Sequence, residues 1–258
     1  MPANVVYSSP TGETQPRKRR FQRRRPPVKL ALHANPHYFQ VVSWLLKLRF
    51  MTARQIGRII DPPRKRRTVF DLLRRMYDKG LITRFSVPTK RQGKAQSYGV
   101  QTIHCLDVAG AKFLADRYET TRSAIDWKPR DNQKHSFLDH RLATNHVLIT
   151  MYLAARKLGW RFDIIQSERD VHKRGGHDWV TDPKTKRRKP VKADAVCRLT
   201  LPTNKSAWLS AEVDMGTEGE AKVKQKFRLH RQHYVSGKYR QRHDTPSSRI
   251  PLVLTPKS

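Results

Sequence analysis

A predicted β-hairpin and the helix that follows it, in residues 192–234, constrain the fold of this chain more than any other segment. Two stretches rich in Val, Leu and other apolar residues are separated by a polar turn, as expected of a hairpin. Asp194 lies near the start of the first strand, whereas Glu212 and Asp214 lie at the end of the second, two residues apart and on one face. The spacing therefore predicts that three carboxylates meet at one edge of a small sheet.

Three carboxylates at such an edge predict a site for a hard divalent cation. Mg²⁺ prefers oxygen ligands, with water molecules completing its coordination shell. The chain has 21 Asp and Glu residues against 54 Lys and Arg residues, so the cluster is not a by-product of an acidic composition. A Lys-rich helix begins after Gly216 and would place positive charge beside the cluster, where it can neutralise a phosphate.

The charge of the whole chain indicates a polyanionic partner. The formal net charge is +33 and the sequence pI is about 11.0, which favours nucleic acid. No apolar run approaches the length of a membrane span, so no membrane partner is expected. Cys105 and Cys197 are isolated from each other, which indicates neither a zinc site nor a disulfide framework and favours a reducing cytoplasm.

Residues 1–35 are predicted to form a disordered basic tail. Seven of the nine residues in Arg17–Arg25 are Lys or Arg, and their mutual repulsion prevents the segment from packing into a core. We interpret the tail as an arm that binds phosphates. A solvated tail without a partner is the alternative interpretation.

Residues 36–118 have the pattern helix, helix, helix, strand, basic turn, strand. Thr52 is a predicted helix cap, and the third helix, over residues 64–79, carries its apolar residues on one face. The pattern, with its GLITR segment after the third helix, resembles the winged helix-turn-helix domain of DNA-binding proteins. The resemblance implies a third helix in the major groove and basic residues on the flanking phosphates. The predicted DNA-binding residues are Arg64, Lys65, Arg66, Arg67, Arg74, Arg75, Lys90, Arg91 and Lys94.

Residues 119–134 are a predicted linker, and residues 135–258 are predicted to form a second domain. Its element order is helix, strand, strand, strand, helix, strand, with residues 173–190 as a basic loop and residues 218–239 as one helix. That order is the core of the restriction-endonuclease-like, or PD-(D/E)xK, fold. The chain is thus predicted to be a mixed α+β or α/β protein, with an N-terminal winged helix-turn-helix followed by a restriction-endonuclease-like (αβββαβ) domain.

Several short motifs occur in a distinctive order along the chain. His135 or His140 precedes Asn145 on a helix, Asp194 stands between two alanines, and the run EVDMGTE starts at Glu212. Together they resemble the replication-relaxation family, whose members pair a winged helix with a nuclease-like domain and are found on plasmids and mobile elements. The resemblance implies DNA processing in replication or mobilisation, by a metal-dependent nickase or relaxase.

An active PD-(D/E)xK site holds its metal with an Asp and a Glu, and a Lys two residues after the Glu activates water or steadies the phosphate. Asp194 and Glu212 match the ligand positions, but Asp214 stands where the Lys is expected. The resemblance therefore implies that Lys222 or Lys226, on the following helix, replaces it. The residues implied in catalysis are Asp194, Glu212, Asp214 and Lys226. The residues implied in binding Mg²⁺ or Mn²⁺ are Asp194, Glu212, Asp214 and Glu168.

Two other functions stay open at the level of the sequence. A nuclease-like fold kept only for DNA binding would make the protein a non-catalytic accessory or a transcriptional repressor, and the basic tail would also suit an RNA-binding protein. His230 and His233, three residues apart on a helix, are a weak zinc motif, and we expect them to face solvent or a phosphate. The expected partners are double-stranded DNA, a second copy of the chain in a homodimer, and other mobilisation or replication proteins.

Overall fold

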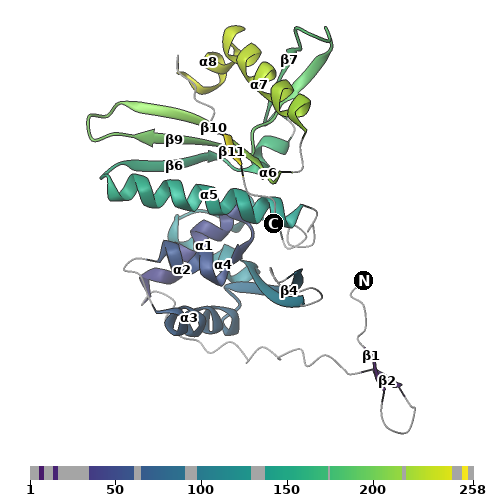
Figure 1. Ribbon diagram of the computed structural model, residues 1–258. Coiled ribbons are helices and arrows are strands. Elements are labelled where there is room, and N and C mark those ends of the chain that lie inside the picture. The colour runs from purple at the N-terminus through teal and green to yellow at the C-terminus, as the bar shows by residue number, and fades with distance from the viewer. Residues whose placement is uncertain are drawn as a thin grey trace.

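The computed structural model places a mixed set of helices and strands along most of the chain (Figure 1). The ranges that it describes are 35–60, 65–90, 98–128, 137–173, 175–216 and 219–245. Three short strands add to these ranges: β1 (Val6–Ser8), β2 (Thr14–Pro16) and β11 (Leu252–Leu254). Most of the predicted basic tail, Arg64, and the turn residues Arg91 and Lys94 lie outside the described residues.

The N-terminal unit, residues 35–128, has the predicted order of three helices followed by two long strands. Its elements are α1 (Pro36–Leu48), β3 (Met51–Thr52), α2 (Ala53–Ile59), α3 (Arg66–Asp78), β4 (Ile82–Lys90), β5 (Tyr98–Leu106), α4 (Val108–Arg117) and the 3₁₀ turn η2 (Arg122–Ala124). β5 lies between β3 and β4 in an antiparallel sheet. The predicted cap of α2 is confirmed, because Thr52 and Gln55 exchange side-chain to backbone hydrogen bonds of 3.1 and 2.9 Å.

One face of α3 forms the core of this unit. Val69, Leu72, Leu73 and Met76 recur at helical spacing and are all buried. The arginines of α3 lie on its other face, which is exposed. The helix thus presents positive charge to solvent while its apolar face fixes its orientation.

The C-terminal unit begins at residue 137 and centres on a four-stranded sheet. Its elements are α5 (Leu138–Lys157), β6 (Arg161–Gln166), α6 (Glu168–His172), β7 (Asp178–Thr181), β8 (Arg188–Val191), β9 (Ala195–Thr200), β10 (Ser206–Asp214), α7 (Glu220–Val235) and α8 (Lys238–His243). The strand order is β11-β10-β9-β6, with β10 and β11 parallel and the other neighbours antiparallel. Figure 1 shows this sheet between α5 on one side and α7 on the other.

Two predictions for this unit were wrong. The predicted basic loop 173–190 contains the hairpin β7–β8, whose strands pair from Asp178 opposite Val191 to Thr181 opposite Arg188. A buried Asp182 closes its turn, since its side chain accepts from the Lys184 N–H at 3.0 Å. The predicted single helix 218–239 is two helices, because Gly237, in the left-handed region at φ +73°, breaks the chain between α7 and α8.

α5 joins the two units through one hydrophobic core. Leu148 and Ile149 of α5 pack in the same buried cluster as residues of the N-terminal helices and as Cys197 and Ala211 of the sheet. Figure 1 shows α5 lying between the N-terminal elements and the sheet. Trp127, in the predicted linker, belongs to this cluster and is 3% exposed.

Buried polar contacts fix α5 against the N-terminal unit. The Asn145 side-chain amide donates to the Leu48 and Phe50 carbonyls at 3.2 and 2.7 Å, where α1 ends. The Gln55 side chain donates to the Leu142 carbonyl at 2.7 Å. Such buried hydrogen bonds favour one relative placement of the two units, because a shift would leave the buried amides of Asn145 and Gln55 without these acceptors.

Replacing Asn145 by Ala should therefore destabilise both units together. We expect the free energy of unfolding to fall by about 2–4 kcal/mol, because two buried hydrogen bonds are lost and a cavity is left. Urea unfolding followed by circular dichroism measures the loss, and the transition should stay single. Lys157→Ala, at an exposed position of the same helix, is the control and should change stability by less than about 0.5 kcal/mol. A separate early transition of one unit would contradict the shared core.

Candidate functional site

The candidate site lies where β9 begins and β10 ends. Asp194 immediately precedes β9, and Glu212 lies near the end of β10. The two strands are antiparallel neighbours, so the start of one adjoins the end of the other, and the Asp194 N–H donates to the Ala211 carbonyl at 2.9 Å. α7 crosses this edge and adds Lys226 and His230.

Glu212 is buried and is held by two side chains of α7. It is 2% exposed. His230 Nε2 lies 2.7 Å from Glu212 Oε1, and Lys226 Nζ lies 3.1 Å from Oε2. Lys226 and His230 are four residues apart, which places them on the same face of the helix. Oε2 has no partner in good hydrogen-bonding geometry despite the nearby ammonium, so it can still accept a ligand.

Asp194 faces Glu212 in a partly buried setting. Its Oδ2 accepts from the Val213 N–H at 2.7 Å, and His140 Nε2 lies 3.1 Å from its Oδ1. Burial, and then the charge of Glu212, raise the pKa of Asp194 to about 7. The Val213 N–H and Lys226 oppose this increase without cancelling it. Two carboxylates that disfavour each other's charge in this way would be stabilised by a shared cation.

Glu168, the first residue of α6, lies near this pair. Its Oε2 pairs with Arg141 Nε at 3.1 Å, and its charge contributes to the raised pKa of Asp194. Asp194 and Glu168 line a hollow of about 20 Å³, to which Arg49 of the N-terminal unit also contributes. A space of that size has room for one water molecule or ion.

Asp214 behaves differently from the other predicted ligands. It is 5% exposed, and its Oδ1 accepts from the Gly216 N–H at 2.9 Å, within the turn that ends β10. Across the described residues, no group of three or more His, Cys, Asp or Glu side chains is already arranged to hold a metal. Of the four predicted ligands, Asp194 and Glu212 face each other, Glu168 lies next to them, and Asp214 is turned to Gly216.

Sequence reasoning missed how the histidines are used. His230 and His233 are 7% and 5% exposed, so the expectation that they face solvent or phosphate was wrong. His233 Nε2 lies 2.7 Å from Asp178 Oδ2, as His230 lies beside Glu212. Lys226 and His230 are four residues apart, and this spacing could have indicated that both side chains of α7 contact the same residue.

A second, partly buried cluster anchors the β7–β8 hairpin next to the site. Arg242 of α8 binds Asp178 with two hydrogen bonds, of 2.7 and 2.8 Å. Burial opposes ionisation of Asp178, but the hydrogen bonds from Arg242 and His233 outweigh it and lower its pKa to about 2. The hairpin is thus tied to both α7 and α8.

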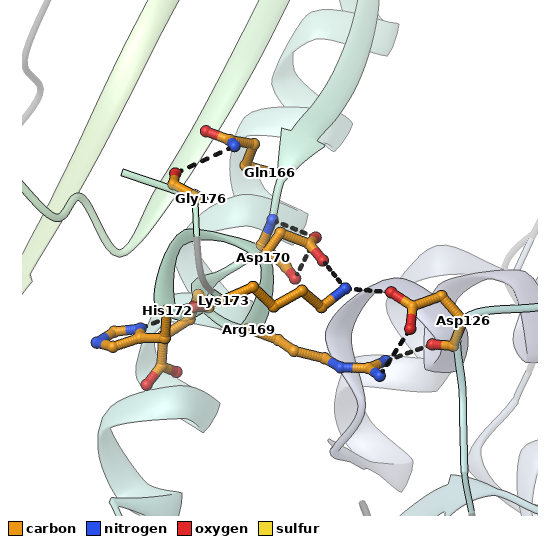
Figure 2. Close-up of polar contacts among 9 residues, drawn as sticks. Asp126, Gln166, Arg169, Asp170, His172, Lys173 and Gly176 are labelled. Atoms are coloured by element: carbon orange, nitrogen blue, oxygen red, sulfur yellow. Dashed lines mark hydrogen bonds and ion pairs between the residues drawn. The ribbon is translucent and has the colours of Figure 1, made fainter. Parts of the chain in front are cut away.

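Ion pairs also hold α6 against the N-terminal unit. Figure 2 shows Arg169 and Lys173 pointing toward Asp126, which lies just after η2. Arg169 Nη2 lies 3.1 Å from Asp126 Oδ1, and Lys173 also pairs with Asp170 at 2.9 Å. α6 starts at Glu168, so these contacts help to position one of the candidate ligands.

A comparison with family models shows which family the chain belongs to. Residues 42–248 match the model described as replication-relaxation. The chain belongs to the replication-relaxation family. Membership suggests a role in plasmid or mobile-element replication or relaxation, and it is compatible with DNA binding. Comparison with curated proteins and with solved structures finds no match.

The basic residues of α3 lie on an exposed face of this replication-relaxation protein. The exposed ones at or near the helix start are Lys65, Arg66 and Arg67, and those further along are Arg74 and Arg75. Arg66 lies over the ring of Phe70, 5.4 Å from its centroid, and that ring is 45% exposed. Lys90 ends β4, and its side chain lies outside the described residues. None of the helices described here has the length and apolar character needed to cross a membrane.

Proposed function

We propose that this replication-relaxation protein is a metal-dependent DNA nickase, or relaxase, that acts in the replication or mobilisation of a plasmid or mobile element. The observation that carries the proposal is the position of Lys226. A lysine from α7 lies 3.1 Å from Glu212, beside the carboxylate of the neighbouring strand end, Asp194. An Asp, a Glu and a Lys are the three side chains that the PD-(D/E)xK reaction requires.

Lys226 explains how the motif can work without a lysine at the usual position. Asp214 occupies the position two residues after Glu212, and its carboxylate is bound to the turn at Gly216. α7 returns over the sheet edge and supplies the ammonium group from a different element. This position of Lys226 supports a nuclease-like interpretation of the C-terminal unit, in which α5, β6, β9, β10, α7 and β11 follow one another with α6, the β7–β8 hairpin and α8 as additions.

Each side chain has a task that follows from its contacts. Asp194 and Glu212 would hold Mg²⁺ or Mn²⁺, which when bound polarises the scissile phosphate and makes water a better nucleophile. Lys226 would hold a phosphate oxygen against the carboxylates, as an ammonium is a compact point charge with three donors. His230 positions Glu212, and His140 positions Asp194, by contacts of 2.7 and 3.1 Å.

The N-terminal unit would bring duplex DNA to the site. Its three helices and two-stranded hairpin support a winged-helix interpretation, in which α3 enters the major groove. The exposed arginines of α3 would contact bases and phosphates.

Supercoiled plasmid DNA tests the proposal directly. We expect purified full-length protein to convert it to open circles when Mg²⁺ or Mn²⁺ is present, and to stop when EDTA is added. Glu212→Gln should abolish nicking because it removes the charge that both the cation and Lys226 require. Glu220→Gln is the control. It also removes one negative charge, but at an exposed position of α7 that is away from the site, so this variant should nick the plasmid normally. Cation-independent nicking, or equal loss in both variants, would refute the proposal.

One observation favours a second function, that of a non-catalytic DNA-binding accessory or repressor. Glu212 already has His230 and Lys226 as neighbours, so its charge is compensated in the chain itself. Under that function the same assay gives binding of the plasmid without a change in its topology.

A further inference from the structure

The β7–β8 hairpin lies at the end of the molecule that is far from α3 (Figure 1). It carries an exposed tryptophan, Trp179. Trp179 is 42% exposed, whereas the next residue, Val180, is 3% exposed and packs with Val191 and Leu229 of α7. The hairpin is therefore anchored by one face and presents Trp179 on the other. A rigidly held aromatic ring in solvent is a suitable surface for stacking.

Trp179 borders an open hollow of about 470 Å³. This volume is within the range of about 300–1,000 Å³ for pockets that bind small ligands. The residues that line it are His177, Asp178, Trp179, Arg188, Lys238, Gln241 and Arg242. The Arg188 guanidinium carbon lies 5.8 Å from the centre of the Trp179 ring, and the His177 ring centre lies 5.8 Å away.

The charges around the hollow favour an anion. Arg242 is neutralised by Asp178, but Arg188 and Lys238 have no carboxylate in contact among the described residues. Lys238 donates one hydrogen bond to the Trp179 carbonyl at 2.6 Å, which leaves two of its three N–H groups for a ligand. Lys184, Lys186 and Arg187, in the turn of the hairpin, are exposed but do not line the hollow.

We propose that this hollow binds an unpaired nucleotide of single-stranded DNA. The base would stack on Trp179, and Arg188 and Lys238 would bind the adjoining phosphates. Aromatic rings beside basic side chains are the common solution for binding single strands, because every base has a face on which to stack. In a duplex that face is covered by the neighbouring base pairs, so the hollow selects unpaired DNA.

α7 connects the hollow to the candidate active site. His230 contacts Glu212, and His233, three residues later, contacts Asp178 at the edge of the hollow. The biological use of the hollow rests on the proposed function, since nicking would release the strand that it binds. Binding itself does not require nicking, so the two can be tested separately.

The test measures binding of a short deoxythymidine oligonucleotide to the full chain in EDTA, where no cation supports cleavage. Fluorescence anisotropy gives the affinity, and tryptophan quenching reports stacking. Trp179→Leu should weaken binding by about five- to a hundredfold, the range expected for one stacked base. Trp179→Phe keeps an aromatic ring, so it should keep most of the affinity while the quenching is lost.

Matched variants separate this site from the general attraction of a basic protein. Arg188→Gln should weaken binding several-fold, whereas Arg187→Gln, the same charge change one residue away, should have little effect. Wild type should bind an oligonucleotide of abasic sites about as weakly as Trp179→Leu binds the intact one. A fully paired duplex should bind wild type and Trp179→Leu equally.

Three outcomes would overturn the inference. Trp179→Leu could bind the single strand as tightly as wild type does, or the Arg187 and Arg188 variants could lose the same affinity. The third is that a uridine RNA binds more tightly than DNA.

Discussion

Lys226→Met is expected to bind plasmid DNA like wild type and to lose at least about a hundredfold in nicking rate. The size of the effect is that of removing one preorganised group that stabilises transition-state charge. Lys226 lies 3.1 Å from Glu212 Oε2, so its ammonium is already in place before DNA arrives. Single-turnover nicking measures the rate, and anisotropy with a duplex measures binding.

Two further variants make this prediction specific. Lys226→Arg keeps the charge but not the compact ammonium, so it should recover only part of the activity. Lys224→Met removes a lysine of α7 that pairs with Glu220 and is 67% exposed, and it should cut normally. If Lys222→Met loses nicking and Lys226→Met does not, the lysine that replaces the usual one has been assigned to the wrong position.

Asp194→Asn is expected to be more stable than wild type above neutral pH, by an amount on the order of 3 kcal/mol. The pKa of Asp194 is about 7 in the folded chain, against about 3.9 in an unfolded one. A protonated Asp194 therefore contributes stability that is fully present below about pH 4 and is lost as the pH rises through 7. Asn is neutral throughout, and its amide can still meet the Val213 N–H and His140.

Urea unfolding between pH 4 and pH 8 measures this difference. The two proteins should be about equally stable at the acid end, diverge between about pH 4 and pH 7, and keep a constant difference above that. Mg²⁺ should reduce the difference at pH 8 if it binds the wild-type carboxylates, because binding to the folded state alone stabilises it. If the free energies of unfolding of the two proteins change with pH in the same way, ionisation of Asp194 does not destabilise the folded chain and the prediction is wrong.

Much of the framework follows from local patterns in the sequence. The apolar spacing of α3, the cap at Thr52 and the hairpin with Asp194 and Glu212 at adjoining strand ends all depend on residues close together in the chain. Strand alternation also placed Glu212 and Asp214 on one face. It did not reveal that the turn at Gly216 binds Asp214, because that depends on how the strand ends.

The features that could not be predicted depend on contacts between distant segments. The β7–β8 hairpin looks like a basic loop, since only Val180 and Val191 mark its buried face and both require Leu229 of α7 to pack against. His230 and His233 look like surface residues until the sheet supplies Glu212 and Asp178 as partners. The role of Asn145 is equally invisible, because its partners lie more than ninety residues earlier.

The shared helix α5 also bears on where such an enzyme would cut. The arginines of α3 and the carboxylate of Asp194 belong to units that share one hydrophobic core, so such an enzyme would not swing its site along DNA after binding. The bond that reaches Asp194 would then lie at a constant offset from the bases that α3 would read. The distance between α3 and Asp194 would then determine which bond, and which strand, is cleaved, without a second step of sequence recognition.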